Sequence, residues 1–333
     1  MPFANHSLHR PSRHAAMFLL AAAWSMLCLL SAGELSRLAS PLWSDFVREF
    51  IAAVLLSGGF YAMARAWVKD LRPLSSIGFV RRPGIGGEFA RGAALGWGIA
   101  IALVLPALLT GNLSMEFAFD AATLVRTGCS AVLLVLFALV VQLVLSGLPV
   151  RMLLKATSPG WTAAAVVFVV TILALTGAAS QGRTLPIMAL TASIFVAGFL
   201  RTRAIWFSLG LQLGWSLVLQ LLFGASSPYT PGTFSSIQSV LDGPIWLTGE
   251  PFGPEASIVT VLVLIFALVM LFRLTRDYAW HYTWQPQEGA GYAMEVAPPA
   301  EHVKEEQRHA AAAPLVQIGG LQPPQFPHRD PQA

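Results

Sequence analysis

Residues 129–149 read CSAVLLVLFALVVQLVLSGLP and contain no charged side chain. Because about 20 consecutive apolar residues are enough for a helix to cross the hydrocarbon core of a bilayer, this stretch predicts a membrane-spanning helix. The rest of the 333-residue chain has the same character, with 55% hydrophobic and only 11% charged residues. A soluble domain carries about 25% charged residues. The composition therefore excludes an ordinary soluble enzyme, a disordered chain and a disulfide scaffold.

Eight stretches of the chain are long and apolar enough to span a membrane, so we expect an all-α, polytopic membrane helical bundle. The weakest boundary lies near Arg201 and Arg203, which interrupt a nearly continuous apolar run. The first stretch starts like a signal peptide, but its apolar run is longer than a signal core, which favours a retained anchor. The predicted spans are 14–33, 47–67, 92–111, 129–149, 161–180, 185–203, 204–223 and 256–273.

The basic residues predict how the bundle is oriented, because Lys and Arg accumulate in cytoplasmic loops. With the N-terminus inside, 17 of the 21 basic residues fall on the cytoplasmic side, and only Arg37, Arg48, Arg126 and Arg183 do not. We therefore expect both termini to be cytoplasmic and the protein to reside in a bacterial cytoplasmic (inner) membrane. Orientation also explains the net charge of +4, so the lipid bilayer is an expected partner and nucleic acid is not.

The same patterns divide the chain into three regions. Residues 1–71 hold an N-terminal pair of spans, residues 72–277 hold the membrane core, and residues 278–333 form a tail rich in Pro, Gln, Ala, Glu and His. Such a tail cannot bury a core, so we expect it to be disordered. Four aromatic residues that follow the last span are typical of an interfacial belt: Tyr278, Trp280, Tyr282 and Trp284.

The middle of the chain lacks the residues that most catalytic and metal sites use. No Asp or Glu lies between residues 121 and 241, and no His lies between residues 15 and 280. Proteins hold zinc with Cys, His, Asp or Glu, and a buried general base is usually His, Glu or Asp. Spans four to seven offer only Cys129. We therefore expect no metal, no cofactor and no ionisable group for proton-coupled transport.

Neutral polar residues in the spans are the remaining candidates for a binding site. Gln142 and Ser146 are four residues apart and share one helix face, and Gln212 and Ser216 have the same spacing. Both glutamines lie roughly 12 Å from the cytoplasmic end of their spans at the helix rise, so the two pairs can face each other. They either only bond one another and hold the helices together, or line a pocket for a ligand. The candidate pocket residues are Gln142, Ser146, Thr171, Gln212, Trp215 and Ser216.

Several segments between residues 72 and 273 resemble the CPBP family of intramembrane metalloproteases, the CAAX-protease and bacteriocin-processing group. PLSSIGFVRRP at 73–83 is similar to the family's cytoplasmic segment before its core helices, and LTGEPFGPE at 247–255 is similar to its outer loop before the final helix. The resemblance implies the family's helical bundle. Active members of the family use glutamates and histidines, together with a metal, to activate a water. That water cleaves a peptide bond near the cytoplasmic face.

The motifs that carry this chemistry are replaced in the present chain. VQLVLSG at 141–147 stands where the family has EExxxRG, FVVTI at 168–172 where it has FxxxH, and QLGWS at 212–216 where it has HxxxN. The resemblance therefore implies the fold but assigns no catalytic residue and no zinc. The replaced motif positions are occupied by Val141, Gln142, Ser146, Ile172, Gln212 and Ser216.

These observations favour a catalytically inactive homologue that keeps the bundle and binds a peptide, another membrane protein or a lipid. One alternative is a membrane endopeptidase with a non-standard site, in which the glutamine and serine side chains polarise a carbonyl. It lacks a base to activate a nucleophile or a water. Another alternative is a small-solute carrier, which needs a continuous polar path through spans that show only scattered Ser, Thr and Gln.

Overall fold

A computed structural model describes residues 9–68, 73–81, 84–176, 184–225, 227, 230–249, 253–276, 304–305 and 307–308. The chain divides into two units, Met1–Tyr282 and Thr283–Ala333. All helices and strands considered below belong to the first unit. The predicted disorder of the tail and the predicted aromatic belt at 278–284 lie outside the described residues, apart from the four tail positions just given.

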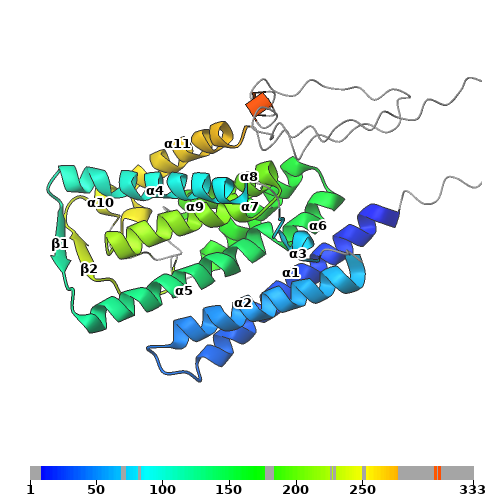
Figure 1. Ribbon diagram of the computed structural model, residues 1–333, viewed down its shortest axis with the longest axis horizontal. Helices are drawn as coiled ribbons and strands as arrows, with labels where there is room; N and C mark the ends of the chain where they lie inside the picture. The colour runs from blue at the N-terminus through cyan, green and yellow to red at the C-terminus, as the bar shows by residue number, and fades with distance from the viewer. Residues whose placement is uncertain are drawn as a thin grey trace, which may run out of the picture. The chain divides into compact units, whose positions relative to one another are not determined.

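Helices make up most of the described chain (Figure 1). They are α1 (His9–Ser36), α2 (Ser44–Met63), α3 (Pro73–Ile77), α4 (Ile85–Leu109), α5 (Ala121–Ser146), α6 (Leu148–Ala156), α7 (Pro159–Thr176), α8 (Thr184–Thr202), α9 (Trp206–Ser216), α10 (Ile245–Thr248) and α11 (Ile258–Leu274). The π-helices η1 (Ala64–Val68) and η2 (Leu217–Leu222) follow α2 and α9, and a 3-10 turn, η3 (Pro254–Ala256), precedes α11. The strands are β1 (Leu113–Phe117) and β2 (Ile237–Leu241).

The predicted all-α membrane bundle is confirmed in its main feature. Five helical segments are long and apolar enough to cross a membrane: Ser12–Ser36, Ser44–Ala66, Ile85–Leu109, Ala121–Ala156 and Leu185–Thr202. The other three predicted spans correspond to shorter apolar helices at Pro159–Ile172, Trp206–Leu222 and Ile258–Leu274. The chain is therefore an integral membrane protein, while the number of crossings stays a prediction.

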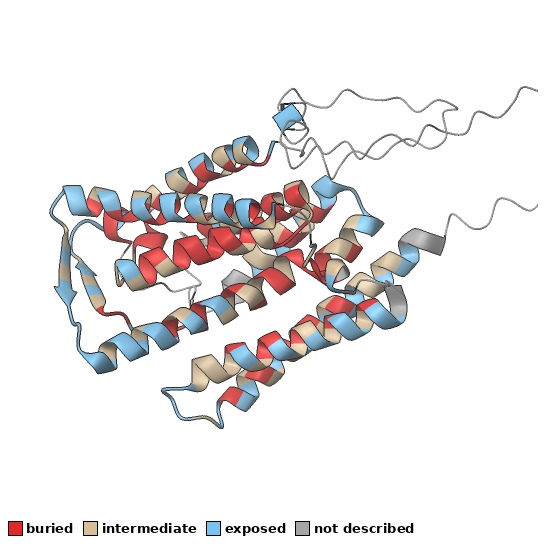
Figure 2. Cartoon of the chain, in the orientation of Figure 1, coloured by how far each residue is buried: buried red, intermediate tan, exposed pale blue. Residues whose placement is uncertain are grey.

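Helix α9 occupies the centre of the bundle, between α4 and α5 (Figure 1). Nearly all of its residues are buried, whereas the outward faces of α4, α5 and α11 are exposed (Figure 2). Those outward faces carry large hydrophobic side chains, and Trp97 and Leu262 are 55% and 65% exposed. Contiguous apolar surface of this kind marks contact with lipid, so the buried helix is central and the others face the bilayer.

Four glycines explain how α9 comes so close to α4. Gly92 and Gly96 lie on the side of α4 that faces α9, and Gly210 and Gly214 lie on the side of α9 that faces α4, each pair being spaced four residues apart. A Cβ atom at any of these four positions would overlap backbone atoms of the facing helix. Small residues at this spacing let two helix backbones touch. Such close packing stabilises helix pairs in lipid, because burying apolar surface there gives no free-energy gain.

The helix predicted at 129–149 is longer at its start and ends earlier. It begins at Ala121, where Asp120 caps it by accepting a hydrogen bond from the backbone N–H of Thr123 at 3.2 Å. It ends at Ser146 because Gly147 takes an extended conformation, and Pro149 then lies in the first turn of α6. The chain thus turns immediately after Ser146, the last residue of the candidate site on α5.

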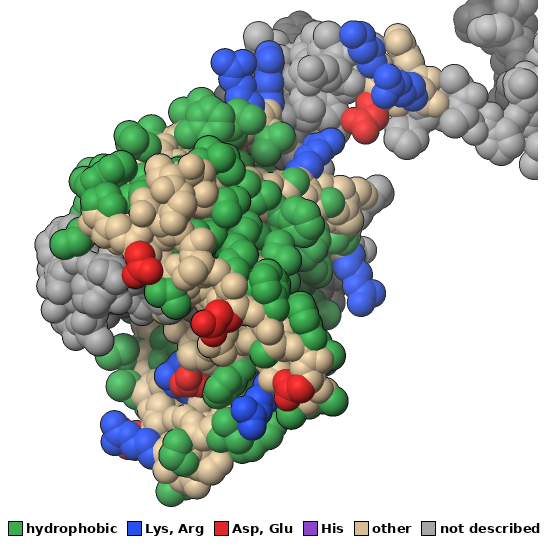
Figure 3. Space-filling model, turned by 90° about the vertical axis from the view of Figure 1, so that its left-hand side faces the viewer, with side chains coloured by type: hydrophobic (Ala, Val, Ile, Leu, Met, Phe, Trp, Pro, Cys, Tyr) green, Lys and Arg blue, Asp and Glu red, His purple; other side chains and the backbone are tan. Residues whose placement is uncertain are grey.

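The structure contains a small antiparallel sheet that the sequence did not lead us to expect. Strand β1, between α4 and α5, pairs with β2 in the Gly-, Pro- and Ser-rich segment 224–255, and Met115 lies opposite Ser239. The sheet closes the end of the bundle that Figure 3 shows, where hydrophobic side chains surround a few acidic and basic ones. It ties the segment before α10 to the bundle.

Replacing Gly214 by Ala should destabilise the protein by about 1–3 kcal/mol, the usual cost of an added methyl group in a packed interior. The matched control is Gly98→Ala on α4, because Gly98 is exposed and a Cβ there meets no atom within 4 Å. The thermal unfolding midpoint of the detergent-purified variants measures the effect. Equal midpoints for the two variants would contradict a close α4–α9 contact.

Candidate functional site

The structure brings Gln142 and Gln212 together in the interior of the bundle. The side-chain amide of Gln142 donates a hydrogen bond to Oε1 of Gln212 at 2.8 Å, and the hydroxyl of Ser146 donates to Oε1 of Gln142 at 3.1 Å. All three side chains are buried. The proximity expected from matched depth is therefore present, and the motif positions on α5 and α9 form one polar network.

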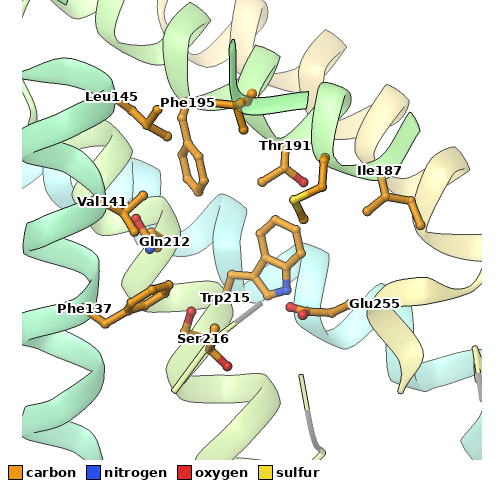
Figure 4. A pocket seen from close by; sticks show the side chains of 14 residues that line it. Phe137, Val141, Leu145, Ile187, Thr191, Phe195, Gln212, Trp215, Ser216 and Glu255 are labelled. Atoms are coloured by element: carbon orange, nitrogen blue, oxygen red, sulfur yellow. The ribbon is translucent and has the colours of Figure 1, made fainter. Parts of the chain in front are cut away.

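A cavity of about 160 Å³ lies beside this network, between α5, α7, α8 and α9 (Figure 4). Of the sequence-predicted site residues, Gln212, Trp215 and Ser216 line it, whereas Gln142 and Ser146 do not. Gln212 accepts the hydrogen bond from Gln142 through Oε1, and its side-chain amide also lines the cavity. The lining residues are Phe137, Val141, Leu145, Val170, Ile187, Met188, Thr191, Ala192, Phe195, Gln212, Trp215, Ser216, Thr230 and Glu255.

Helix α7 contributes differently from what the resemblance implies. Val170 lines the cavity, but its neighbour Thr171 does not, and the hydroxyl of Thr171 donates to the carbonyl of Val167 on its own helix at 2.7 Å. Phe168 and Ile172, the two positions matched to FxxxH, are 66% and 43% exposed. Because successive helical residues point in different directions, a placement based on motif spacing alone missed the lining residue.

Two threonine hydroxyls leave polar atoms unpaired beside the cavity. Oγ1 of Thr191 on α8 and Oγ1 of Thr230 after η2 are buried, and neither has a hydrogen-bond partner among the described residues. Both residues line the cavity. Because buried polar groups in native proteins are nearly always paired, two unpaired hydroxyls at one cavity are a feature of a site that receives a polar ligand.

Glu255 is the functional residue that sequence reasoning missed. It lies in η3, outside the membrane-spanning helices, yet it is buried and lines the cavity from the side opposite Gln212 (Figure 4). The hydroxyl of Ser227 donates a hydrogen bond to its carboxylate, and the indole N–H of Trp215 points at it. The sequence places no carboxylate in spans four to seven, and we expected no ionisable group for proton-coupled transport; the structure corrects this, because Glu255 reaches the cavity from outside those spans.

Burial is the main influence on the Glu255 carboxyl and raises its pKa to about 7. The hydrogen bond from Ser227 and the nearby indole N–H of Trp215 favour the ionised form and act in the opposite direction, but less strongly. A carboxyl with a pKa near neutrality can exchange a proton under physiological conditions. The cavity therefore has a titratable group at one end and a neutral amide at the other.

Two glycines turn the chain so that Glu255 points inward. Gly249 and Gly253 have φ angles of 72° and 82°, in the left-handed region that other residues rarely adopt. A Cβ on Gly249 would overlap the carbonyl oxygen of Gly253, so the two are packed against each other. In the sequence GEPFGPE these glycines are visible, but nothing in their spacing shows that the turn enters the bundle.

Metal-binding residues do not gather at the site. Within the part of the chain that the structure describes, no three His, Cys, Asp or Glu side chains form a group that could hold a metal ion. The amides and hydroxyls at the site can form hydrogen bonds, and the carboxyl of Glu255 can exchange a proton. Comparison of the chain with protein-family models, curated proteins and solved structures finds no match.

The stability of the protein should depend on pH through Glu255. The folded state holds the carboxyl proton up to a pKa of about 7, whereas the ordinary value is 4.5. Between these values the folded state binds more protons than the unfolded state, so stability falls as the pH rises. We expect the thermal midpoint of the wild type to decrease from about pH 5 to about pH 8, and that of Glu255→Gln to decrease less.

The matched control for this measurement is Glu116→Gln, which removes an exposed carboxylate on β1. It should retain the wild-type pH dependence. An equal decrease in the wild type and in Glu255→Gln would show that the carboxyl of Glu255 is not held in its neutral form.

Proposed function

We propose that this integral membrane protein is a catalytically inactive, CPBP-like bundle that binds a peptide, a segment of another membrane protein or a lipid in the cavity beside Gln212. The observation that carries the proposal is the Gln142–Gln212 hydrogen bond at 2.8 Å, next to a cavity with unpaired hydroxyls. Amides donate and accept hydrogen bonds but are poor bases. This site is therefore suited to holding a polar group without cleaving it.

The replaced motif positions support binding over hydrolysis. Val141 and Gln212 line the cavity with an apolar and a neutral side chain, and Ile172 is exposed on α7. A membrane endopeptidase with a non-standard site would have to rely on Glu255 alone, at the far side of Trp215 from Gln212 (Figure 4). Among the described residues that line the cavity, Glu255 is the only carboxylate and there is no imidazole.

Glu255 also favours a second candidate function, that of a small-solute carrier. Proton-coupled carriers use an ionisable group inside the bundle, and the buried carboxyl of Glu255 is such a group. The turn that carries it is non-helical chain enclosed by protein, which membrane proteins tolerate where it lines a cavity. Uptake of a bound solute into proteoliposomes under a proton gradient would separate a carrier from a binding protein.

Photo-crosslinking tests the binding proposal directly. A diazirine-bearing amino acid at Val141 reports on the cavity, and one at Val169 is the matched control, because Val169 is 51% exposed on the outward face of α7. After crosslinking in native membranes, mass spectrometry should find a product that forms from position 141 and not from position 169. Identical products at both positions would show that only bulk lipid is reached.

We also propose the orientation that the basic residues predict, with both termini cytoplasmic in a bacterial inner membrane. A topology reporter fused after Ser226 should then read as external, and one fused after Asp277 as cytoplasmic. In each fusion the chain runs from its first residue to the fusion point. Two reporters are used, one that is active only outside the membrane and one that is active only in the cytoplasm. The reverse result at either position would refute the orientation.

A further inference from the structure

We propose that the ligand of this cavity carries an organic ammonium group, with Glu255 as its counter-ion and Trp215 as its aromatic wall. The proposal deepens the proposed function and rests on it, because it names the chemical class that the same cavity takes. It concerns the end of the cavity that lies away from the Gln142–Gln212 network.

The charge around Glu255 is unbalanced. In the described part of the chain, its carboxylate forms no ion pair, and both its hydrogen-bond partner Ser227 and its neighbour Trp215 are neutral. Burying an unpaired charge is costly. A cationic ligand would pair with this charge, and an anionic ligand would meet no cationic side chain among the residues that line the cavity.

The walls of the cavity also suit a cation. The rings of Phe137, Phe195 and Trp215 all line it, and Figure 4 shows Trp215 beside Glu255 and the two phenylalanines toward the Gln212 side. Aromatic faces attract ammonium groups, and several rings around one site are a recurrent way of binding them. With Glu255 at one end and the amide donor of Gln212 at the other, the cavity fits a ligand that joins an ammonium group to a hydrogen-bond acceptor.

Among the described residues, no charged group on the elements packed against Glu255 competes for this role. The elements packed against η3 are α4, α8, α10 and α11. Their charged side chains are Glu88 and Arg91 on α4, Arg201 on α8 and Arg273 on α11, and none of them contributes to the pKa of Glu255. An ammonium ligand would therefore displace the proton, and its affinity should rise as the pH is raised through about 7.

The experiment compares two probes of equal shape, 2-phenylethylamine and 2-phenylethanol, with the full-length protein in a maltoside detergent. Equilibrium dialysis gives both affinities. At about pH 8 the amine should bind the wild type at least about tenfold more tightly than the alcohol, and the amine's own affinity should be about tenfold weaker at about pH 6. Glu255→Gln should lose the preference for the amine, and the surface control Glu116→Gln should keep it.

The wild-type comparison decides the question even where Glu255→Gln does not fold. Equal affinity for the amine and the alcohol, or an amine affinity that does not depend on pH, would overturn the ammonium proposal and leave the binding proposal standing. Binding of neither probe, together with a specific crosslink from Val141, would have the same consequence. If neither probe binds and no specific crosslink forms from Val141, the proposed function is refuted as well.

A final arm identifies the source of the ammonium group. Phosphatidylethanolamine and phosphatidylglycerol are added separately to the amine-loaded protein. Displacement of the amine by the first lipid alone supports a lipid headgroup as the ligand, and displacement by neither supports a soluble amine. Equal displacement by both lipids would show that the probe binds an unspecific lipid surface and would overturn the proposal.

Discussion

Backbone contact between α4 and α9 is the constraint on which the rest of the bundle depends. At Gly92 and Gly96 on α4, and at Gly210 and Gly214 on α9, the helices are so close that an added Cβ would overlap the facing backbone. In a bilayer, where helices gain little from hiding apolar surface, such close packing is what holds them together. It confines α9 to the centre, and so places Gln212 inside the protein, where its hydrogen-bonding groups need partners from other helices.

A second constraint acts on the turn before α11. Non-helical backbone is stable inside a membrane protein only where protein encloses it or water fills a cavity. The short η3 segment after Gly253 meets this condition by packing against α4 and α8. It brings a carboxyl group to the cavity, where the described α-helical residues that line it include no Asp or Glu.

The sequence predicted the features that depend on composition and on helical spacing. Long apolar runs located the helices, and matched depth predicted that Gln142 and Gln212 would meet, as their hydrogen bond shows. Features that depend on long-range packing were missed: the pairing of β1 with β2, the inward turn to Glu255, and the outward direction of Ile172. Each requires knowing which segment lies next to which, and that information is not carried by local spacing.

The two polar ends of the cavity differ in what they contribute. Gln142 and Gln212 are neutral and bond one another, so together they form a contact worth only about 0.6 kcal/mol in a membrane interior. Glu255 cannot be satisfied in the same way, because a buried carboxylate needs either a proton or a cation. A residue that stabilises the empty protein only when protonated is poorly explained as part of the scaffold. It is well explained as the group that a positively charged ligand must meet.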